Sequence, residues 1–153
     1  MSVSICRVQW EIAAPLLQQV REKVFICEWR IPEDIEFDCC DLQAYHMLVC
    51  DDQTQEPVAT GRILPTGEIS RIAVLISYRK QELDKIVLKA LLDIANELEL
   101  DEIFINSPLD QVSYFRNNGF YIAGSVFMEA GMPRQRMACK VKQVALVNCY
   151  LTH

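Results

Sequence analysis

Hydrophobic residues recur along residues 79–100 at the spacing of one face of an α-helix, and charged residues keep to the other side. The apolar positions are Leu83, Ile86, Val87, Ala90, Leu91, Ile94, Ala95 and Leu98. An earlier helix is predicted from about Pro15, because proline suits a first helical turn. A short helix over 110–118 is predicted to end at Gly119. The longest of these helices is the one over 79–100.

The segments between the helices have the composition of β-strands. They are predicted at 5–10, 44–50, 57–64, 68–76, 102–106, 120–128 and 136–146. Polar turns at 51–56 and 65–67 join the second, third and fourth strands into a meander. The order is β-α-β-β-β-α-β-α-β-β. It predicts a single α+β domain over residues 1–153, with helices packed on a mostly antiparallel sheet.

The composition limits which classes of function are compatible with this fold. Of 153 residues, 51% are hydrophobic, which is enough for a proper core. Fifteen Lys and Arg against 21 Asp and Glu give a net charge of −6, which argues against binding a nucleic-acid backbone. The sequence shows neither a signal peptide nor a membrane-spanning apolar run. We therefore expect a cytoplasmic protein without nucleic-acid or membrane partners.

Cysteines are frequent, at Cys6, Cys27, Cys39, Cys40, Cys50, Cys139 and Cys149. An odd number without a secretory signal indicates reduced thiols rather than a disulfide framework. The nearest approach to a metal-binding cluster is Cys39, Cys40, His46 and Cys50, which lacks the two-residue spacing typical of zinc sites. We expect no metal site, and cysteines that pack as small apolar side chains.

Short motifs follow one another in a consistent order along nearly the whole chain. They comprise Arg21, Val24, Phe25, Glu28, Ile31, Pro32, Glu36, Asp38, Asp41, Ala44, His46, Ala59-Thr60-Gly61-Arg62, Arg71-Ile72-Ala73-Val74, Tyr78-Arg79, Gly119-Phe120, Phe127, Glu129-Ala130-Gly131-Met132-Pro133 and Met137. This series resembles the GNAT superfamily of acyl-CoA-dependent N-acetyltransferases. The resemblance implies the GNAT fold, acetyl-CoA as the acyl donor and a small-molecule amine as the acceptor.

Part of the same pattern resembles a second group of enzymes that share this fold. Arg21, Phe25, Trp29, Asp38, Asp41 and Arg62 are similar to positions in acyl-homoserine-lactone synthases. Trp29 lies closer to Phe25 than the pattern of those synthases expects, and the synthases are usually longer. An activity like theirs is therefore the minor alternative.

The resemblance also implies where acetyl-CoA binds. The strand before the long helix would pair with the pantetheine arm through Ile72, Ala73 and Val74, with Asn106 at the end of the following strand. A loop of pattern Gln/Arg-x-x-Gly-x-Gly/Ala would present backbone N–H groups to the pyrophosphate. Here the loop is degenerate. It consists of Arg79, Lys80, Gln81, Glu82, Leu83 and Asp84, followed by Lys85.

Glu82 and Asp84 stand at the two glycine positions of that loop and admit two interpretations. Their charge and volume oppose a phosphate, although Arg79, Lys80 and Lys85 lie nearby, so one hypothesis is an acetyltransferase with a weakened cofactor site. The other is that the acids stabilise the positive end of a helix that no longer binds pyrophosphate. The protein would then be a non-catalytic binding or interaction module of the GNAT fold.

The general acid that the resemblance implies is a tyrosine four residues before Gly119. Phe115 occupies this position and has no proton to give. Tyr114 is adjacent, but on a regular helix it points about 100° away. Tyr114 is therefore a candidate only if the helix is rotated or irregular.

Two residues are candidates for the base that deprotonates the acceptor amine. Glu28 follows the apolar run 24–26, and we expect burial there to raise its pKa. Its alternative role is that of a solvated carboxylate at a helix end. His46 lies in a strand with core-facing apolar positions, where a structural hydrogen bond is the favoured role.

The remaining charged candidates lie in the loop before residue 44 and at strand ends. Arg62 and Arg71 are predicted to pair with Glu36, Asp38 or Asp41 in a structural network rather than to contact a substrate. The alternative for these acids is recognition of a cationic acceptor amine, and capping of a turn is favoured over it.

Two features bear on the acceptor and on assembly. The motifs resemble those of one bacterial branch of the GNAT superfamily, which often has histidine where this sequence has Arg134. Arginine cannot act as a base at neutral pH, but it can bind a carboxylate or a phosphate. The sequence does not identify the acceptor. The apolar tail 144–151 is predicted either to add a strand at the edge of a homodimer or to pack within the monomer.

Overall fold

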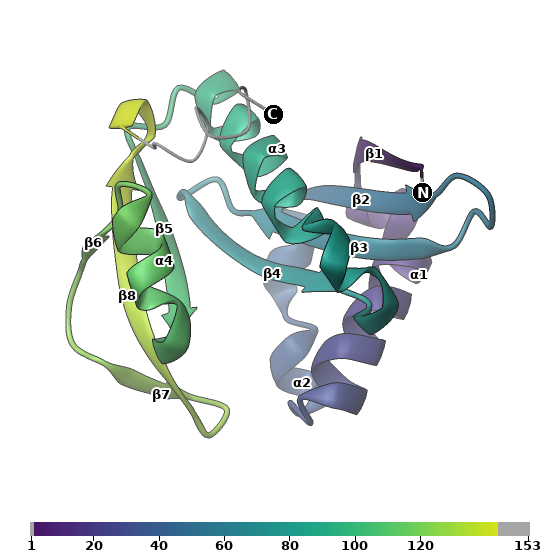
Figure 1. Ribbon diagram of the computed structural model, residues 1–153, viewed down its shortest axis with the longest axis horizontal. Helices are drawn as coiled ribbons and strands as arrows, with labels where there is room; N and C mark the ends of the chain where they lie inside the picture. Colours follow the sequence, from purple (N-terminus) through teal and green to yellow (C-terminus); the bar gives the residue numbers. More distant parts are fainter. Residues whose placement is uncertain (1, 144–153) are drawn as a thin grey trace.

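The computed structural model describes residues 2–143, and its centre is one sheet of eight strands (Figure 1). The strands are β1 (Val3–Val8), β2 (Tyr45–Asp51), β3 (Pro57–Ile63), β4 (Glu68–Val74), β5 (Glu102–Pro108), β6 (Tyr121–Ile122), β7 (Phe127–Glu129) and β8 (Met132–Lys140). They lie in the order β1-β2-β3-β4-β5-β8-β6, and β7 pairs with β8. All the neighbouring pairs are antiparallel except β4 with β5. The predicted α+β class and the mostly antiparallel sheet are confirmed.

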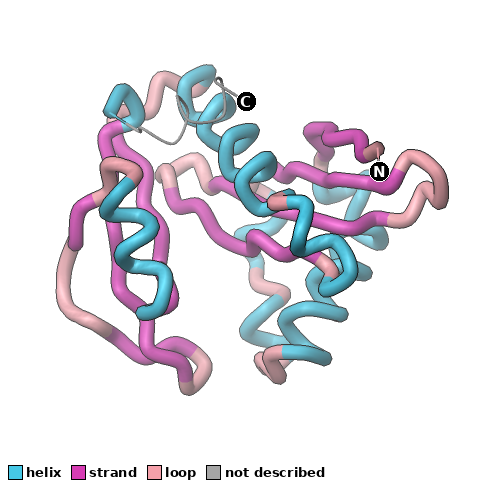
Figure 2. The backbone as a smooth tube through the Cα atoms, viewed as in Figure 1, coloured by secondary structure: helices cyan, strands magenta, loops and turns pink. Residues whose placement is uncertain are grey.

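Helices flank the sheet on both faces (Figures 1 and 2). They are α1 (Trp10–Arg21), which a π-helical segment continues (Glu22–Glu28), α2 (Glu33–Glu36), α3 (Leu83–Glu97) and α4 (Val112–Asn117). Helix α3 packs on β2, β3 and β4, α1 contacts the same three strands, and α4 contacts β6 and β8. Within the described residues, every helix is too short or too polar to cross a membrane.

The main core lies between α3 and the sheet. The buried residues of α3 are Leu83, Val87, Leu88, Leu91, Leu92, Ile94 and Ala95, whereas Ile86 of the predicted stripe is exposed. Gly61 on β3 lets the helix approach closely, because a Cβ atom there would collide with Val87 and lie 3.1 Å from Leu91 Cδ1. Close helix–sheet packing therefore explains why this position lacks a side chain.

The boundaries of two predicted helices were wrong. Helix α3 begins at Leu83 rather than near Arg79, because Glu82 has left-handed backbone angles (φ 55°, ψ 38°) and residues 76–81 form a 3₁₀ turn before it. Helix α1 begins at Trp10, where the Gln9 carbonyl accepts the first helical hydrogen bonds. Pro15 is thus an interior residue of α1 rather than its start.

The last two predicted strands also differ from the structure. The segment 120–128 is divided into β6 and β7, because the chain leaves β8 around Gly124, whose φ of 96° favours glycine. Strand β8 begins at Met132 instead of Arg136, since a tight turn at Ala130 and Gly131 folds it back on β7. The predicted tail strand 144–151 lies outside the described residues.

Strands β4 and β5 pair over a short distance and then separate. Their parallel register comprises Glu68 with Phe104 and Ile69 with Ile105, although both strands continue beyond it. The register of β4 against β3 shifts between Thr60 and Arg62, opposite Arg71, which has a φ of 58°. Such a bulge bends a strand, and the two strands form an open V in the middle of the sheet (Figure 1). The β5-facing edge of β4 after Ile69 has no partner among the described strands.

Candidate functional site

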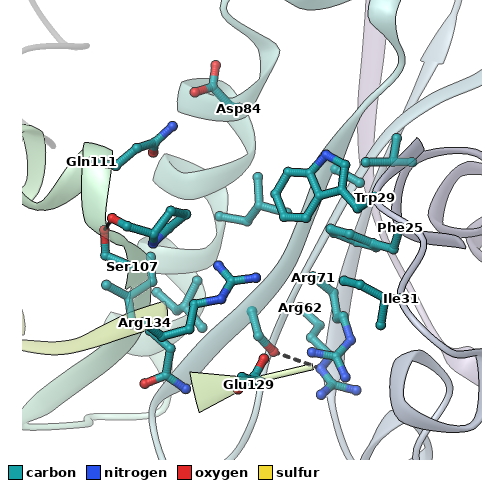
Figure 3. Close-up of a pocket in the computed structure, with 18 of the residues that line it drawn as sticks. Phe25, Trp29, Ile31, Arg62, Arg71, Asp84, Ser107, Gln111, Glu129 and Arg134 are labelled. Carbon is teal, nitrogen blue, oxygen red and sulfur yellow. Dashed lines mark hydrogen bonds between the residues drawn. The ribbon is translucent and has the colours of Figure 1, made fainter. Parts of the chain in front are cut away.

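A cavity of about 650 Å³ fills the opening between β4 and β5. Its walls come from β4 and β5, the π-helical segment and α2, the first turn of α3, α4 and the β7–β8 hairpin (Figure 3). Segments far apart in the sequence thus meet where the sheet splits. A concave site of this size accommodates a small-molecule ligand.

Most residues proposed as acetyl-CoA contacts lie on the cavity wall. Those that do are Ile72, Ala73, Val74, Arg79, Asp84, Lys85, Asn106 and Phe115, and those that do not are Lys80, Gln81, Glu82 and Leu83. Asn106 donates a hydrogen bond from Nδ2 to Glu68 Oε1 (3.2 Å), while its buried Oδ1 has no hydrogen-bond partner among residues 2–143. A buried carbonyl oxygen without a donor is costly, so this atom marks a place where a ligand N–H group fits.

The loop of residues 79–84 presents acids rather than open backbone at the start of α3. Glu82 is exposed and its carboxylate pairs with Lys85 Nζ at 2.9 Å, without capping the helix. Asp84 lines the cavity, as does Gln111 (Figure 3). Asp84 therefore puts an exposed carboxylate on the cavity wall at the first turn of α3, the end of a helix that favours an anion.

Glu28 and Arg79, predicted to serve in different parts of the site, bind each other. The Arg79 guanidinium donates two hydrogen bonds to the Glu28 carboxylate, both 2.6 Å, and a third to the Val74 carbonyl oxygen at 3.0 Å. Hydrogen bonding to Arg79 holds the pKa of the exposed Glu28 carboxyl below its ordinary value. The prediction that burial raises this pKa is wrong, because the side chain leaves the apolar run and turns to Arg79. Glu28 does not line the main cavity.

Tyr114 and Phe115 both reach the cavity. Phe115 is buried against Phe120, with ring centroids 5.3 Å apart, and Tyr114 is half-buried with Lys85 Nζ 5.9 Å from its ring. Helix α4 is short and follows a 3₁₀ turn (Leu109–Gln111). Tyr114 therefore lines the cavity although its side chain and that of Phe115 point in different directions from the short helix.

His46 lies inside the protein and away from the cavity. Its side chain is 1% exposed, its Nε2 is hydrogen-bonded to the Asp41 carbonyl oxygen at 2.9 Å, and its ring lies 5.4 Å from that of Trp10. Burial lowers its pKa. The geometry favours the structural role over that of a base that meets a substrate.

The buried His46 gives the free energy of unfolding a pH dependence of defined sign. The pKa of His46 in the folded chain lies below the ordinary 6.5. As the pH falls below 6.5, the unfolded chain therefore binds a proton at His46 before the folded chain does. The stabilisation is complete above about pH 6.5 and falls at lower pH, by up to about 1.4 kcal/mol per pH unit. Urea unfolding measured between about pH 7.5 and 5.5 tests this, with His153 replaced by Gln in every sample. His46→Gln is expected to flatten the curve, and a slope that survives it contradicts the assignment.

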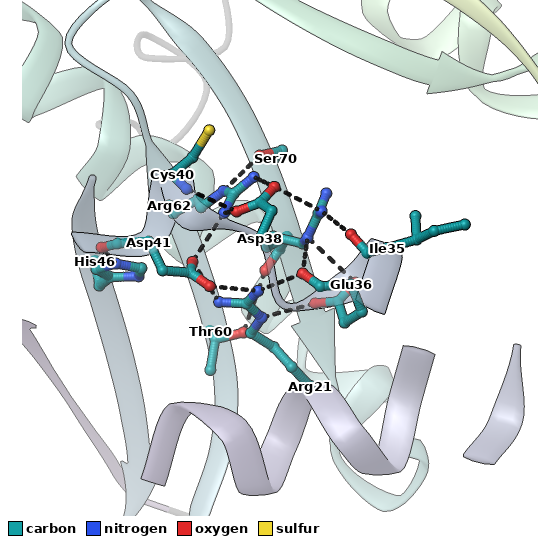
Figure 4. A network of polar contacts seen from close by, with 11 residues as sticks. Arg21, Ile35, Glu36, Asp38, Cys40, Asp41, His46, Thr60, Arg62 and Ser70 are labelled. Carbon is teal, nitrogen blue, oxygen red and sulfur yellow. Dashed lines mark hydrogen bonds and ion pairs between the residues drawn. The ribbon is translucent and has the colours of Figure 1, made fainter. Parts of the chain in front are cut away.

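A largely buried network of three arginines and three acids lies at the cavity wall (Figure 4), and Glu36, Asp38, Arg62 and Arg71 line the cavity themselves. Arg62 bonds Asp38 and Asp41, each at 2.8 Å, and Arg71 contacts Glu36 and Asp38, each at 3.2 Å. This confirms the predicted network. Burial raises the pKa of Glu36, against the opposing effect of the neighbouring arginines.

The third cation, Arg21, was missing from the predicted network. It is 1% exposed, and it bonds Glu36 at 2.7 Å and Asp41 at 2.8 Å. An arginine that follows Leu17 and Val20 on the apolar face of α1 was the available signal.

The hairpin of β7 and β8 places two charged residues on the cavity wall. Arg134 lies over the Trp29 ring, with 5.8 Å between its guanidinium carbon and the ring centroid. Its buried Nε has no hydrogen-bond partner in the described part of the chain. Glu129 lines the cavity beside it and was not predicted as a site residue. The register pairs Phe127 with Arg134 and Glu129 with Met132, so strand alternation puts both charges on one face.

Comparison with known proteins gives consistent results. A family model described as an acetyltransferase (GNAT) domain matches residues 13–141. The uncharacterized N-acetyltransferase YjcF of Bacillus subtilis is 30% identical over 122 residues, which cover 77% of this chain and 86% of YjcF.

Solved structures show the same fold. An acyl-CoA N-acyltransferase from Pseudomonas aeruginosa superposes with a TM-score of 0.80 at 23% identity, covering 90% of this chain and 99% of that one. Escherichia coli ElaA gives a TM-score of 0.78 at 20% identity, covering 91% and 100%.

Proposed function

The chain belongs to the GNAT family of acetyltransferases, and from this premise we propose that it transfers an acetyl group from acetyl-CoA to the amino group of a small molecule. One observation supports the proposal above all. The cavity opens where β4 and β5 separate, and it lies along the edge of β4 beyond Ile69, which pairs with no other described strand. An extended amide-containing chain can pair with such an edge as an added strand does.

The cavity wall suits the pantetheine arm better than the pyrophosphate. The arm would run along β4 at Ile72–Val74, where Asn106 Oδ1 is placed to accept a hydrogen bond from an amide N–H. The pyrophosphate would lie at the first turn of α3, near Lys85 and against Asp84. Binding there is therefore proposed to be weakened but retained.

The reaction is an attack by the neutral amine on the thioester carbonyl carbon. A C–N bond forms, the C–S bond breaks, the nitrogen loses a proton and the CoA thiolate gains one. Backbone N–H groups at the bulge of β4 would stabilise the developing oxyanion. We assign the proton of the thiolate to Tyr114, whose ring lines the cavity. Glu28 and His46 are disfavoured as bases, since one is bound by Arg79 and the other is buried elsewhere.

Release of the CoA thiol from acetyl-CoA, measured with a broad panel of primary amines, tests the proposed function. We expect saturable turnover with at least part of the panel. Tyr114→Phe is expected to lower kcat and to leave the KM for acetyl-CoA unchanged, because the lost interaction is made in the transition state. Tyr121→Phe is the control, since that exposed tyrosine bonds Glu102 outside the cavity. Equal kcat in the two variants contradicts the role of Tyr114.

A non-catalytic GNAT-fold module is the second candidate, and the loop supports it. Arg79, the residue that matches the family pattern there, is engaged by Glu28, and Asp84 faces the cavity. This candidate predicts no turnover with any amine and no acetyl-CoA binding at physiological concentration. The synthase-like activity, the cytoplasmic location and the homodimer stay predictions.

A further inference from the structure

The cations of the cavity wall divide into those with a carboxylate partner and one without. Arg62 and Arg71 belong to the buried network, Arg79 binds Glu28, and Lys85 binds Glu82. Their charges are neutralised within the protein. A ligand that binds any of these four must share the cation with a carboxylate that already pairs with it.

Arg134 differs from the other four. Within residues 2–143 it has no carboxylate partner, and its Nε is buried without a hydrogen-bond acceptor. Its side chain extends from β8 into the cavity towards Trp29, as Figure 3 shows. A half-buried guanidinium with unused donors is a site for a carboxylate, which it binds through two parallel N–H···O bonds.

Glu129 supplies the opposite charge on the same hairpin face. It is half-buried, it lines the cavity, and it has no ion-pair partner in the described part of the chain. It forms no ion pair with Arg134, although strand alternation places both on one face. The hairpin therefore offers the cavity a separate cation and anion. Trp29, which is 37% exposed, and Ile35 add apolar surface on the opposite wall.

We propose that the acceptor is a small amine that also carries a carboxylate, of the amino-acid type. Arg134 binds the carboxylate, and Glu129 binds the ammonium group and takes its proton before the nitrogen attacks the thioester. The amide product keeps the carboxylate on Arg134 and has lost the positive charge that holds it to Glu129. This inference rests on the proposed function and specifies its substrate class.

The test compares pairs of ligands in which a neutral amide replaces the carboxylate. Ligand-observed NMR measures the binding of phenylalanine and phenylalaninamide, and of leucine and leucinamide, to the full chain with CoA present. We expect each acid to bind about tenfold more tightly than its amide, and the difference to vanish in Arg134→Gln. Arg134→Lys should keep part of this difference, because lysine retains the positive charge but cannot form two parallel N–H···O bonds to a carboxylate.

Arg136→Gln is the matched control. Arg136 lies two residues along the same strand, stacks on Phe104 at 4.5 Å and does not line the cavity. The preference for acids is expected to persist in this variant. Thermal unfolding of all variants checks that they are folded.

The outcomes separate the inference from the proposed function. Equal binding of acids and amides, binding of neither, or a preference that survives Arg134→Gln overturns the inference. Transfer to amines that lack a carboxylate, with no preference for acids, also overturns it but leaves the acetyltransferase function standing. Carboxylate-dependent binding without any thiol release supports the acceptor site and contradicts the acetyltransferase function.

Discussion

Replacing both Glu82 and Asp84 by glycine is expected to tighten acetyl-CoA binding about thirtyfold. Each carboxylate stands where the family loop has glycine. Asp84 lines the cavity and Glu82 directly precedes α3, whose first turn is the proposed site of the phosphates. A like charge about 4 Å away in water costs about 1 kcal/mol, and about 1.4 kcal/mol is tenfold in affinity. Two such charges therefore weaken binding by the stated factor.

The two positions are expected to differ in their effect on folding. Glu82 has a φ of 55°, which glycine adopts without the penalty of a side chain, so Glu82→Gly should preserve or increase stability. Asp84 lies within α3, where glycine is less favourable by about 0.5–1 kcal/mol. Asp84→Asn provides a variant that removes the charge and keeps a side chain.

Calorimetric titration with acetyl-CoA, and with CoA as a companion, measures the effect. Glu99→Gly is a close control, because Glu99 is also an exposed acid with a positive φ (57°) but follows the opposite end of α3. It removes one negative charge and one strained residue far from the cavity. Unchanged affinity in the double glycine variant, or an equal gain in Glu99→Gly, would show that the phosphates do not lie at this loop.

The sequence predicted the fold because its determinants are local. Apolar spacing identified α3, and the polar turn at 51–56 identified the β2–β3 hairpin. The start of α3 was mispredicted because a helix pattern runs on through residues 79–82, and nothing about a glutamate indicates left-handed angles. Element types followed from periodicity, whereas this boundary depended on one backbone conformation.

The part of the site that could be predicted is the network of oppositely charged side chains. Arg62 and Arg71 could be matched with the acids of the preceding loop because those groups have to be paired once buried. The pairing of Glu28 with Arg79 could not be predicted, because the two residues lie 51 positions apart. Glu28 was considered as a base and Arg79 as a cofactor contact, so nothing in the sequence linked them. Glu129 entered the site only through the turn at Ala130 and Gly131, whose φ values of 50° and 80° fold β7 onto β8.

Arg21→Met is expected to lower the free energy of unfolding by about 3–5 kcal/mol. Arg21 is 1% exposed, and it binds the side chains of Glu36 and Asp41, which are buried to a similar degree. Methionine fills part of the volume but leaves two buried carboxylates with one cation fewer. The expected loss of stability is therefore the free energy of burying an uncompensated charge. This free energy is larger than the net contribution of an ion pair to stability.

Arg7→Met separates burial from ion pairing as the cause. Arg7 pairs with Glu97 at 2.6 Å, a distance as short as those of Arg21, but the two side chains are 42% and 66% exposed. Water and salt screen that pair, so its loss should cost under about 1 kcal/mol. Urea unfolding with equal m-values in both variants measures the difference.

The Arg21 network also bears on the cavity. Glu36 and Asp38 contact Arg71, which lies at the bulge where β4 leaves β5. Arg21→Lys keeps the positive charge but loses the planar guanidinium that binds two carboxylates at once. It should therefore destabilise the protein less than Arg21→Met. If the network shapes the split of the sheet, Arg21→Lys will also weaken ligand binding while the protein remains folded. If Arg21→Met lowers the free energy of unfolding by less than about 1 kcal/mol, water or a rearrangement must supply the hydrogen bonds of Glu36 and Asp41. The separation of β4 from β5 would then be maintained by the strands alone.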